Sequence, residues 1–179
     1  LHISIIPDGN RRWAKEKGLA IFAGHERSAN YENFISLFEE ARKLGIKYIT
    51  FWAFSTENWQ RSKKEINFLF SLILKNFKKF KEYAINNNIK FRHLGRKDRI
   101  PKKLALELEK LEEETKNNKG INVQVCLDYG GRDEIIRAVN KVLKSGVNKI
   151  AEKEFFSYLD SAGIPEPDLV IRTSGEQRM

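Results

Sequence analysis

Residues 46–54 read Ile-Lys-Tyr-Ile-Thr-Phe-Trp-Ala-Phe and carry the strongest strand signal in the chain. β-Branched and aromatic residues dominate this stretch, and such residues favour strands. Further apolar runs that predict strands lie at residues 2–6, 89–94, 121–127 and 168–172. Parallel strands need long crossover connections, so the segments between these runs indicate how the strands are arranged.

Apolar residues at helical spacing occupy the segments between the strands. The predicted helices cover about residues 11–17, 26–44, 62–87, 101–116, 132–144 and 152–159. This alternation indicates an α/β fold, a single domain over residues 1–179 with a mainly parallel central sheet flanked by helices. Because the sequence starts at Leu1 and stops at Met179 inside a motif, we expect a fragment that lacks the C-terminal part of the domain.

The composition is that of a folded basic protein. Hydrophobic residues make up 41% of the 179 residues and aromatic residues 11%, which excludes a disordered chain. Lys and Arg number 33 against 24 Asp and Glu, and the net charge of +9 fits nucleic acid, an anionic membrane surface or a phosphorylated small molecule without deciding between them. The basic residues do not interleave with aromatic residues in one motif, so we expect no nucleic-acid binding. The single cysteine, Cys126, excludes a disulfide framework.

Polar or glycine-containing turns follow four of the predicted strands. They are Asp8-Gly9-Asn10-Arg11-Arg12, Ser55 to Arg61, Gly130-Gly131-Arg132 and Arg172 to Arg178. In open α/β sheets, ligands bind beyond the carboxyl ends of the strands, where such turns meet. Arginines bind phosphate through charge-assisted hydrogen bonds, and a single carboxylate suits Mg²⁺, which uses one or two carboxylates with substrate phosphates. The pattern therefore predicts a Mg²⁺-diphosphate site.

Each of these signals also has a purely structural explanation. Asp8-Gly9-Asn10 is a good turn and helix-capping sequence, and His25 can pack at the start of its helix. Glu57 and Glu65 can cap a helix or pair with nearby lysines. The helix at 62–87 has an apolar arc wider than a surface helix needs. It is either buried by the sheet and a partner subunit or forms one wall of an apolar tunnel.

Five motifs in order are more specific than any one of them. They are Asp8 to Ala14, Gly24-His25, Phe54 to Trp59 with Arg61, Tyr129 to Arg132, and Arg172 to Arg178. Together they resemble the cis-prenyltransferases, the undecaprenyl diphosphate synthase family, over essentially the whole chain. The resemblance implies a homodimeric, Mg²⁺-dependent enzyme that extends farnesyl or geranylgeranyl diphosphate, an allylic diphosphate, by repeated addition of isopentenyl diphosphate. It implies a long polyprenyl diphosphate product, the precursor of a glycan carrier lipid, and a cytoplasmic enzyme with peripheral contact to the membrane.

The resemblance also implies roles for individual residues. The catalytic positions are Asp8, which also binds the Mg²⁺, and Asn10, His25, Ser55 and Asn58, which orient substrate or assist proton loss. The substrate-binding positions are Gly9, Arg11, Arg12, Trp13, Trp59 and Arg61 at the allylic site, with Arg172 and Arg178 for the diphosphate of isopentenyl diphosphate. Ala53 and the 62–87 helix line the product tunnel.

Three positions depart from the family pattern. Ile21 stands where many members have an arginine that contacts diphosphate, Ser28 replaces a common glycine, and Asp128 stands where asparagine often precedes Tyr-Gly-Gly-Arg. The family's chain also runs beyond Met179, so we expect weak or no activity from this fragment by itself. The alternative function is a non-catalytic partner subunit of a prenyltransferase complex. The intact Asp8 and its neighbouring arginines argue against this alternative.

Overall fold

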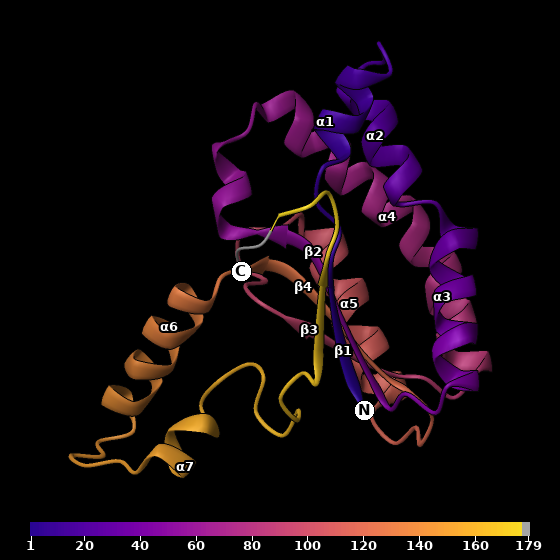
Figure 1. Ribbon diagram of the computed structural model, residues 1–179. Helices are drawn as coiled ribbons and strands as arrows, with labels where there is room; N and C mark the ends of the chain where they lie inside the picture. Colours follow the sequence, from indigo (N-terminus) through magenta and orange to yellow (C-terminus); the bar gives the residue numbers. More distant parts are fainter. Residues whose placement is uncertain (177–179) are drawn as a thin grey trace.

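Five parallel strands form the central sheet of the computed structural model, which describes residues 1–176 (Figure 1). They are β1 (His2–Ile6), β2 (Tyr48–Ser55), β3 (Lys90–Leu94), β4 (Asn122–Tyr129) and β5 (Leu169–Arg172), in the spatial order β3-β4-β2-β1-β5. Every pairing between neighbouring strands is parallel. The predicted parallel sheet is confirmed, although β2 begins and β4 ends two residues later than the sequence pattern predicts.

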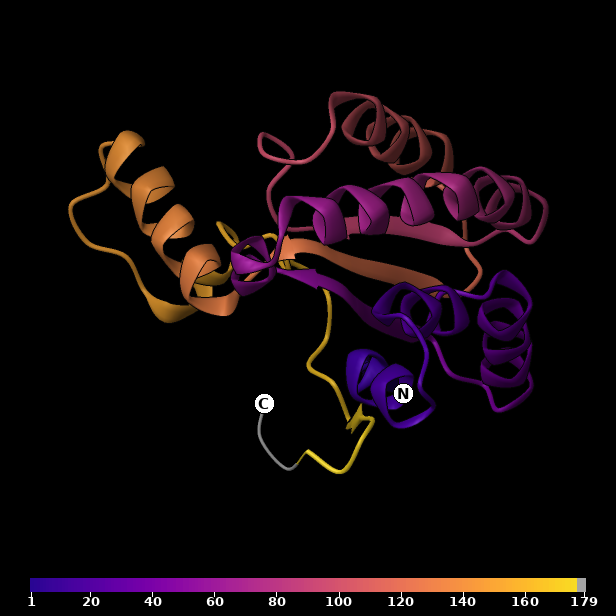
Figure 2. The ribbon, with the colours of Figure 1, turned by 90° about the horizontal axis from the view of Figure 1, so that it is seen from above.

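Helices connect the strands. They are α1 (Asn10–Glu16), α2 (Ile21–Ser28), α3 (Tyr31–Lys43), α4 (Lys63–Asn86), α5 (Lys102–Thr115), α6 (Gly131–Lys144) and α7 (Glu152–Phe156), with a 3-10 helix η1 (Thr56–Gln60) after β2. Helices α4 and α5 lie together over one face of the sheet (Figure 2).

The prediction of one long helix over residues 26–44 is wrong. The side chain of Asn30 accepts a hydrogen bond from the Asn33 N–H at 3.1 Å and caps α3, so a separate helix begins there. His25 consequently lies inside α2 instead of preceding a helix. The helix predicted at 152–159 is also shorter in the structure, where α7 ends at Phe156.

Aromatic side chains fill the core between the sheet and helices α3 and α4. Phe51 of β2 meets Phe38 of α3 edge to face, with ring centroids 5.5 Å apart, and Phe38 lies 5.8 Å from Phe80 of α4. The rings of Phe54 and Phe70 lie 5.0 Å apart. Burying one such ring contributes about 1.5–3 kcal/mol. These contacts hold α3 and α4 on the sheet and thereby place the start of α4 at its carboxyl edge.

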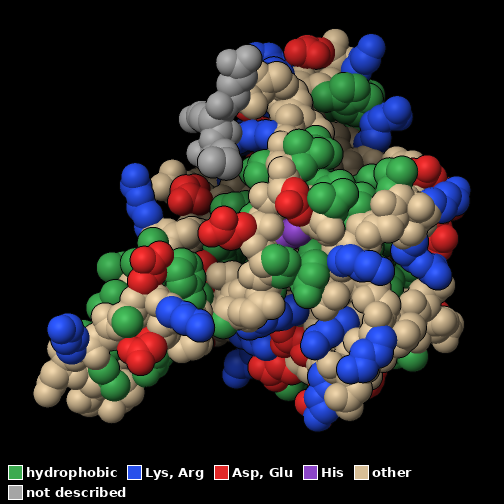
Figure 3. All heavy atoms as spheres, turned by 60° about the horizontal axis from the view of Figure 1, so that its bottom comes forward, with side chains coloured by type: hydrophobic (Ala, Val, Ile, Leu, Met, Phe, Trp, Pro, Cys, Tyr) green, Lys and Arg blue, Asp and Glu red, His purple; other side chains and the backbone are tan. Residues whose placement is uncertain are grey.

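Helix α6 extends away from the sheet (Figures 1 and 2). Its exposed residues include Ile135, Ile136 and Leu143, whose relative exposures are 50%, 60% and 68%. Hydrophobic side chains gather over the lobe that contains α6 and α7, at the lower left of Figure 3. Within residues 1–176, none of the helices combines the length and apolar character that crossing a membrane requires.

Candidate active site

Asp8 stands between the carboxyl end of β1 and the start of α1. Gly9 turns the chain there with a φ of +86°, a left-handed conformation that glycine adopts without a steric penalty. The Gly9 N–H donates to Asp8 Oδ1 at 2.6 Å. A Cβ on Gly9 would lie 2.4 Å from the Cβ of Ser174. The backbone angle and the close approach of the chain after β5 both require glycine at this position.

The end of β5 brings Arg172 onto the same carboxylate, because β5 pairs with β1 and sets Arg172 beside Ile6. Arg172 Nε and Nη2 donate to Asp8 Oδ2 at 3.1 and 2.7 Å. The Thr173 hydroxyl accepts from the Asp8 N–H at 2.7 Å and donates to the Asp8 carbonyl at 2.6 Å. The hydrogen bonds from Arg172 are the main cause that holds the pKa of Asp8 below its usual value, which keeps this carboxylate ionised at neutral pH.

Arg12, in the first turn of α1, reaches the chain that follows β5. Its Nη2 donates to Glu176 Oε1 at 2.9 Å, and its Nη1 donates to the Ser174 carbonyl at 3.4 Å. The Arg12 side chain is 53% exposed. The fold thus brings Asp8, Arg12 and Arg172 together from opposite ends of the chain, as their positions after two parallel strands predict.

A second cluster centres on Glu65, in the first turn of α4. The Glu65 side chain is only 3% exposed, and its Oε1 lies 3.0 Å from both Arg61 Nη1 and His25 Nε2. Arg11 Nε lies 3.8 Å from the same oxygen. Three predicted site residues, His25, Arg61 and Arg11, therefore share one buried carboxylate that joins α1, α2 and α4.

Burial and charge set the protonation of this cluster. Burial lowers the pKa of His25 despite the opposing effect of its hydrogen bond to Glu65, so the imidazole is neutral at pH 7. Burial by itself raises the pKa of Glu65, but His25, Arg61 and Arg11 together shift it below its usual value. An ionised Glu65 requires the proton on His25 Nε2, which leaves Nδ1 as the acceptor nitrogen of the ring.

Ser55 and Asn58 contact each other at the end of β2. The Ser55 N–H donates to Asn58 Oδ1 at 3.1 Å, within the capping box that starts η1. This hydrogen bond gives Asn58 a structural role. The catalytic role expected for both residues stays a prediction.

Trp59 is fixed on two sides. Its ring packs against Phe54 and Phe70, with centroids 5.3 and 5.6 Å away, and its Nε1 donates to Asp128 Oδ1 at 2.7 Å. Trp59 is therefore packed against the core, and the substrate-binding role expected for it stays a prediction.

Trp13 and Asn10 lie on α1. Trp13 is half-buried, and the guanidinium of Arg27 stands 5.1 Å from its ring centroid. Gly24 of α2 packs so closely on α1 that a Cβ there would lie 2.0 Å from the Asn10 carbonyl oxygen. Arg178, expected to bind substrate, lies outside the described residues.

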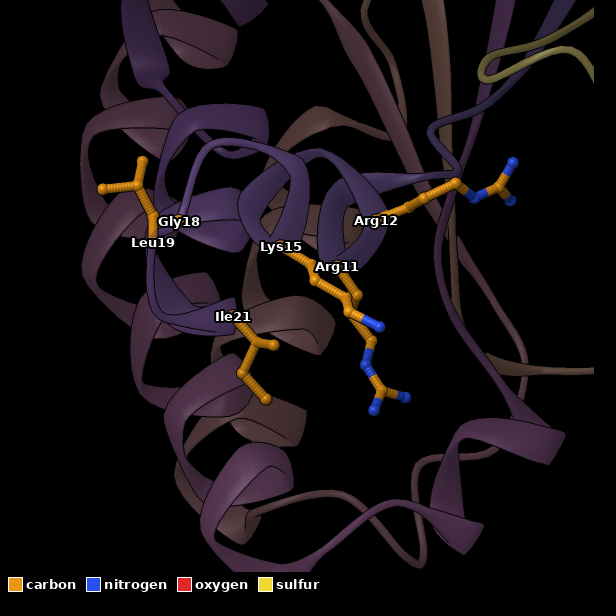
Figure 4. A pocket seen from close by; sticks show the side chains of 6 residues that line it. All are labelled: Arg11, Arg12, Lys15, Gly18, Leu19 and Ile21. Atoms are coloured by element: carbon orange, nitrogen blue, oxygen red, sulfur yellow. The ribbon is translucent and has the colours of Figure 1, made fainter.

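A cavity of about 470 Å³ opens beside α1 and the start of α2 (Figure 4). It is lined by Arg11, Arg12, Lys15, Gly18, Leu19 and Ile21. In Figure 4 the side chains of Arg11 and Lys15 extend in the same direction from α1, whereas that of Leu19 points away from them. Three cations on one open cavity suit an anionic group of a substrate, and Ile21 adds an apolar wall.

Asp8 is the candidate metal ligand. Among residues 1–176, no three side chains of His, Cys, Asp or Glu gather closely enough to hold a metal by themselves. The ionised Asp8 side chain is 33% exposed at the carboxyl edge of the sheet. A single carboxylate fits Mg²⁺, which takes its remaining ligands from water and substrate phosphates.

Sequence reasoning missed several partners that organise the site. Glu65 pairs with Arg61 and His25 instead of the neighbouring lysines. A signal was present, because Arg61 and Glu65 are four residues apart at the start of a helix, a spacing at which opposite charges pair. No local signal marks Glu176 as the partner of Arg12, because 164 residues separate the two.

An ionised carboxylate and arginines at the carboxyl edge of a parallel sheet define an α/β enzyme site for a phosphorylated substrate. A family model described as "Putative undecaprenyl diphosphate synthase" matches residues 6–179. The chain belongs to this family, the cis-prenyltransferases of the undecaprenyl diphosphate synthase type, and it is an enzyme that transfers prenyl groups.

Individual relatives agree with this assignment. The chain is 47% identical to an isoprenyl transferase of Fusobacterium nucleatum and 44% identical to one of Aquifex pyrophilus, and each match covers 99% of this chain and 76% of the relative. Lavandulyl diphosphate synthase from Lavandula x intermedia, in complex with dimethylallyl diphosphate, matches with a TM-score of 0.90 at 33% identity, over 99% of this chain and 78% of that one. A probable undecaprenyl diphosphate synthase from Campylobacter jejuni matches with a TM-score of 0.78 at 29% identity, over 99% and 77% of the two chains.

Proposed function

We propose that this protein is a Mg²⁺-dependent cis-prenyltransferase that adds isopentenyl diphosphate repeatedly to an allylic diphosphate, farnesyl or geranylgeranyl diphosphate. The product is a long polyprenyl diphosphate, the precursor of a glycan carrier lipid. The observation that carries the proposal is the contact of Arg172 with Asp8 beside Arg12, because it unites the first and last motifs of the family at one sheet edge. The similar lavandulyl diphosphate synthase holds an allylic diphosphate, which supports this substrate class.

The proposed reaction breaks the allylic C–O bond, releases diphosphate and forms a C–C bond to the terminal carbon of isopentenyl diphosphate, which then loses a proton. Arg12 and Arg61 bind the allylic diphosphate and stabilise the negative charge that develops on it as it leaves. Arg172, with Arg178, binds the diphosphate of isopentenyl diphosphate. Asp8 holds the Mg²⁺, which when bound neutralises diphosphate charge.

Proton loss from isopentenyl diphosphate needs an acceptor. The neutral His25 has an unprotonated Nδ1, and Glu65 fixes this tautomer, which supports a role for His25 in the proton transfer. Asn10, Ser55 and Asn58 orient the substrates in this proposal.

The growing chain needs an apolar path, and the flank of α4 supports one. Phe68 and Leu72 are half-buried there, and the Phe68 ring lies 4.6 Å from that of Phe22 on α2. Each methylene moved out of water contributes about 0.8 kcal/mol, so such a wall favours elongation. Ala53 is exposed at the end of β2 and completes the proposed lining.

Assembly and location are part of the same proposal. The exposed apolar residues of α6, such as Ile136 and Leu143, support a homodimer, because a partner subunit would remove them from water. The lipid product supports peripheral contact with the membrane, and a cytoplasmic location is part of the proposal.

The test uses the full-length protein with Mg²⁺, labelled isopentenyl diphosphate and farnesyl diphosphate, and resolves the products by chain length. Asp8→Asn is the matched control, because it keeps the shape of the side chain and removes its charge. Long products that vanish in Asp8→Asn support the proposal. A folded dimer that makes no product overturns it and leaves the non-catalytic partner subunit.

A further inference from the structure

Asp128, at the end of β4, has no part in the mechanism above, yet three donors converge on its fully buried carboxylate. Trp59 Nε1 donates to Oδ1 at 2.7 Å. Arg99 donates from Nη2 to Oδ1 at 2.5 Å and from Nε to Oδ2 at 2.8 Å. The Asp128 side chain is 0% exposed and that of Arg99 37%. A buried carboxylate is costly unless it is paired and hydrogen-bonded, and here both conditions are met.

The backbone conformation at Asp128 sets the direction of this carboxylate. Phe54 pairs with Leu127 and Ser55 with Tyr129, so Asp128 is an extra residue in β4 with no partner on β2. Its φ is +54°, in the left-handed region that Asp and Asn tolerate better than other residues with a side chain. Such bulges re-aim a side chain, and they are frequent beside active sites.

The end of β4 also contacts the two segments that supply the donors. The Arg96 N–H, in the loop after β3, donates to the Asp128 carbonyl at 3.0 Å. A Cβ on Gly130 would lie 2.4 Å from Oγ1 of Thr56, the first residue of η1. Therefore η1 and the loop that follows β3 both pack against this bulge.

Trp59 connects the bulge to the candidate site. It precedes by two residues Arg61, whose guanidinium holds the Glu65 carboxylate that also contacts His25. The Arg99 guanidinium stands 5.8 Å from the Trp59 ring centroid, so Arg99 contacts both the carboxylate and the indole. Trp59 is thus held at its N–H and at its ring.

We propose that Asp128, together with Arg99, is a positioning pair that fixes Trp59 and so sets the segment 55–61 for binding of the allylic diphosphate. The inference rests on the proposed prenyl-transfer function. An asparagine at this position accepts the Trp59 hydrogen bond but does not neutralise Arg99. The aspartate therefore adds an ionic link from the loop after β3 to η1.

The kinetic test compares Asp128→Ala and Asp128→Asn in the full-length protein, with Lys97→Ala as the control. Lys97 lies on the same loop as Arg99 but pairs with Glu112 at 2.6 Å. Asp128→Ala should raise the KM for farnesyl diphosphate about tenfold, because the loss of a hydrogen bond to a charged group weakens binding by about that factor. The kcat should stay within about threefold of the wild-type value. Asp128→Asn should recover most of the loss, and Lys97→Ala should change nothing. Partial unfolding lowers the active fraction and hence kcat, so it does not mimic a rise in KM.

A second readout does not depend on activity. Acrylamide quenching of Trp59, taken as the difference from Trp59→Phe, should increase in Asp128→Ala and stay at the wild-type level in Lys97→Ala. If Asp128→Ala does not fold, Asp128→Gly takes its place, because glycine tolerates the positive φ at this position and the change also removes the carboxylate. Unchanged quenching and unchanged KM in the folded variant overturn the inference. A wild-type protein without prenyl-transfer activity, but with the quenching difference, overturns the proposed function and leaves Asp128 as the residue that fixes Trp59.

Discussion

Arg172 donates two hydrogen bonds to a single oxygen of Asp8, although the family resemblance assigns Asp8 to the Mg²⁺ and Arg172 to the diphosphate of isopentenyl diphosphate. Arg172 therefore occupies the carboxylate to which the metal is assigned. In the proposed mechanism, isopentenyl diphosphate would draw Arg172 away from Asp8 and leave the Oδ2 atom available to a cation. Binding of the two ligands is thus expected to be coupled through this one contact.

Arg172→Gln tests the role of the guanidinium. We expect the KM for isopentenyl diphosphate to rise about 10- to 100-fold, because a charge-assisted hydrogen bond to phosphate contributes about 1.5–3 kcal/mol. Steady-state kinetics at saturating farnesyl diphosphate measures this change. Arg42→Gln, which removes an exposed arginine of α3, is the matched control. A KM within about twofold of the wild-type value would show that Arg172 does not bind this substrate.

Glu65→Ala should destabilise the protein by about 3 kcal/mol, because it removes the carboxylate shared by Arg61 and His25 from a buried position. Urea unfolding followed by circular dichroism measures the change in free energy. Glu40→Ala removes an exposed carboxylate whose partner is Lys43, and this control should cost less than about 0.5 kcal/mol. Equal losses in the two variants would contradict a special role for the Glu65 cluster.

Gly9→Ala and Gly45→Ala form a matched pair. Both glycines have positive φ angles, +86° and +71°, so each alanine costs about 1–2 kcal/mol of backbone strain. Only at Gly9 would the new Cβ meet another residue, Ser174, at 2.4 Å. We therefore expect Gly9→Ala to lose both stability and prenyl-transfer activity, whereas Gly45→Ala keeps its activity. Thermal unfolding measures the loss of stability, and the chain-length assay measures the loss of activity. An active Gly9→Ala enzyme would refute the expected close packing of Gly9 on Ser174.

Stability should fall as the pH drops below about 6.5, the ordinary pKa of histidine. Burial lowers the pKa of His25 and of His93 in the folded state, so the unfolded chain binds more protons and acid favours unfolding. Each histidine contributes at most about 1.4 kcal/mol per pH unit to this loss. Urea midpoints between pH 8 and pH 5 measure the slope, which should be shallower in His93→Gln. A midpoint that stays constant over this range would contradict the prediction.

Ile21→Arg introduces the arginine that the family resemblance leads us to expect at this position. The cavity beside it already holds Arg11, Arg12 and Lys15, so a fourth cation should lower the KM for farnesyl diphosphate by about three- to tenfold. Leu19→Arg is the control, since the Leu19 side chain points away from the cations (Figure 4). If both variants lower the KM equally, the gain comes from net charge and not from a contact at residue 21.

Local sequence patterns predict most of the helices and strands of the fold. The strand at Tyr48–Ser55 and the helix at Lys63–Asn86 were predicted closely, because each has a strong periodicity of its own. The break at Asn30 was missed, because a capping side chain inside a long apolar pattern is a weak signal. The bulge at Asp128 was also missed, since a bulge depends on the register between two strands and not on the residues of one.

Strand spacing and ordered motifs are properties of the chain, so they are enough to identify the class of fold, the family and the residues at the sheet edge. The partners of these residues depend on the tertiary structure. It set Arg172 on Asp8, His25 on Glu65, and Arg99 with Trp59 on Asp128. Side chains that are distant in the sequence meet through strand register and helix packing, which depend on the whole core, so no local pattern specifies which charges become neighbours.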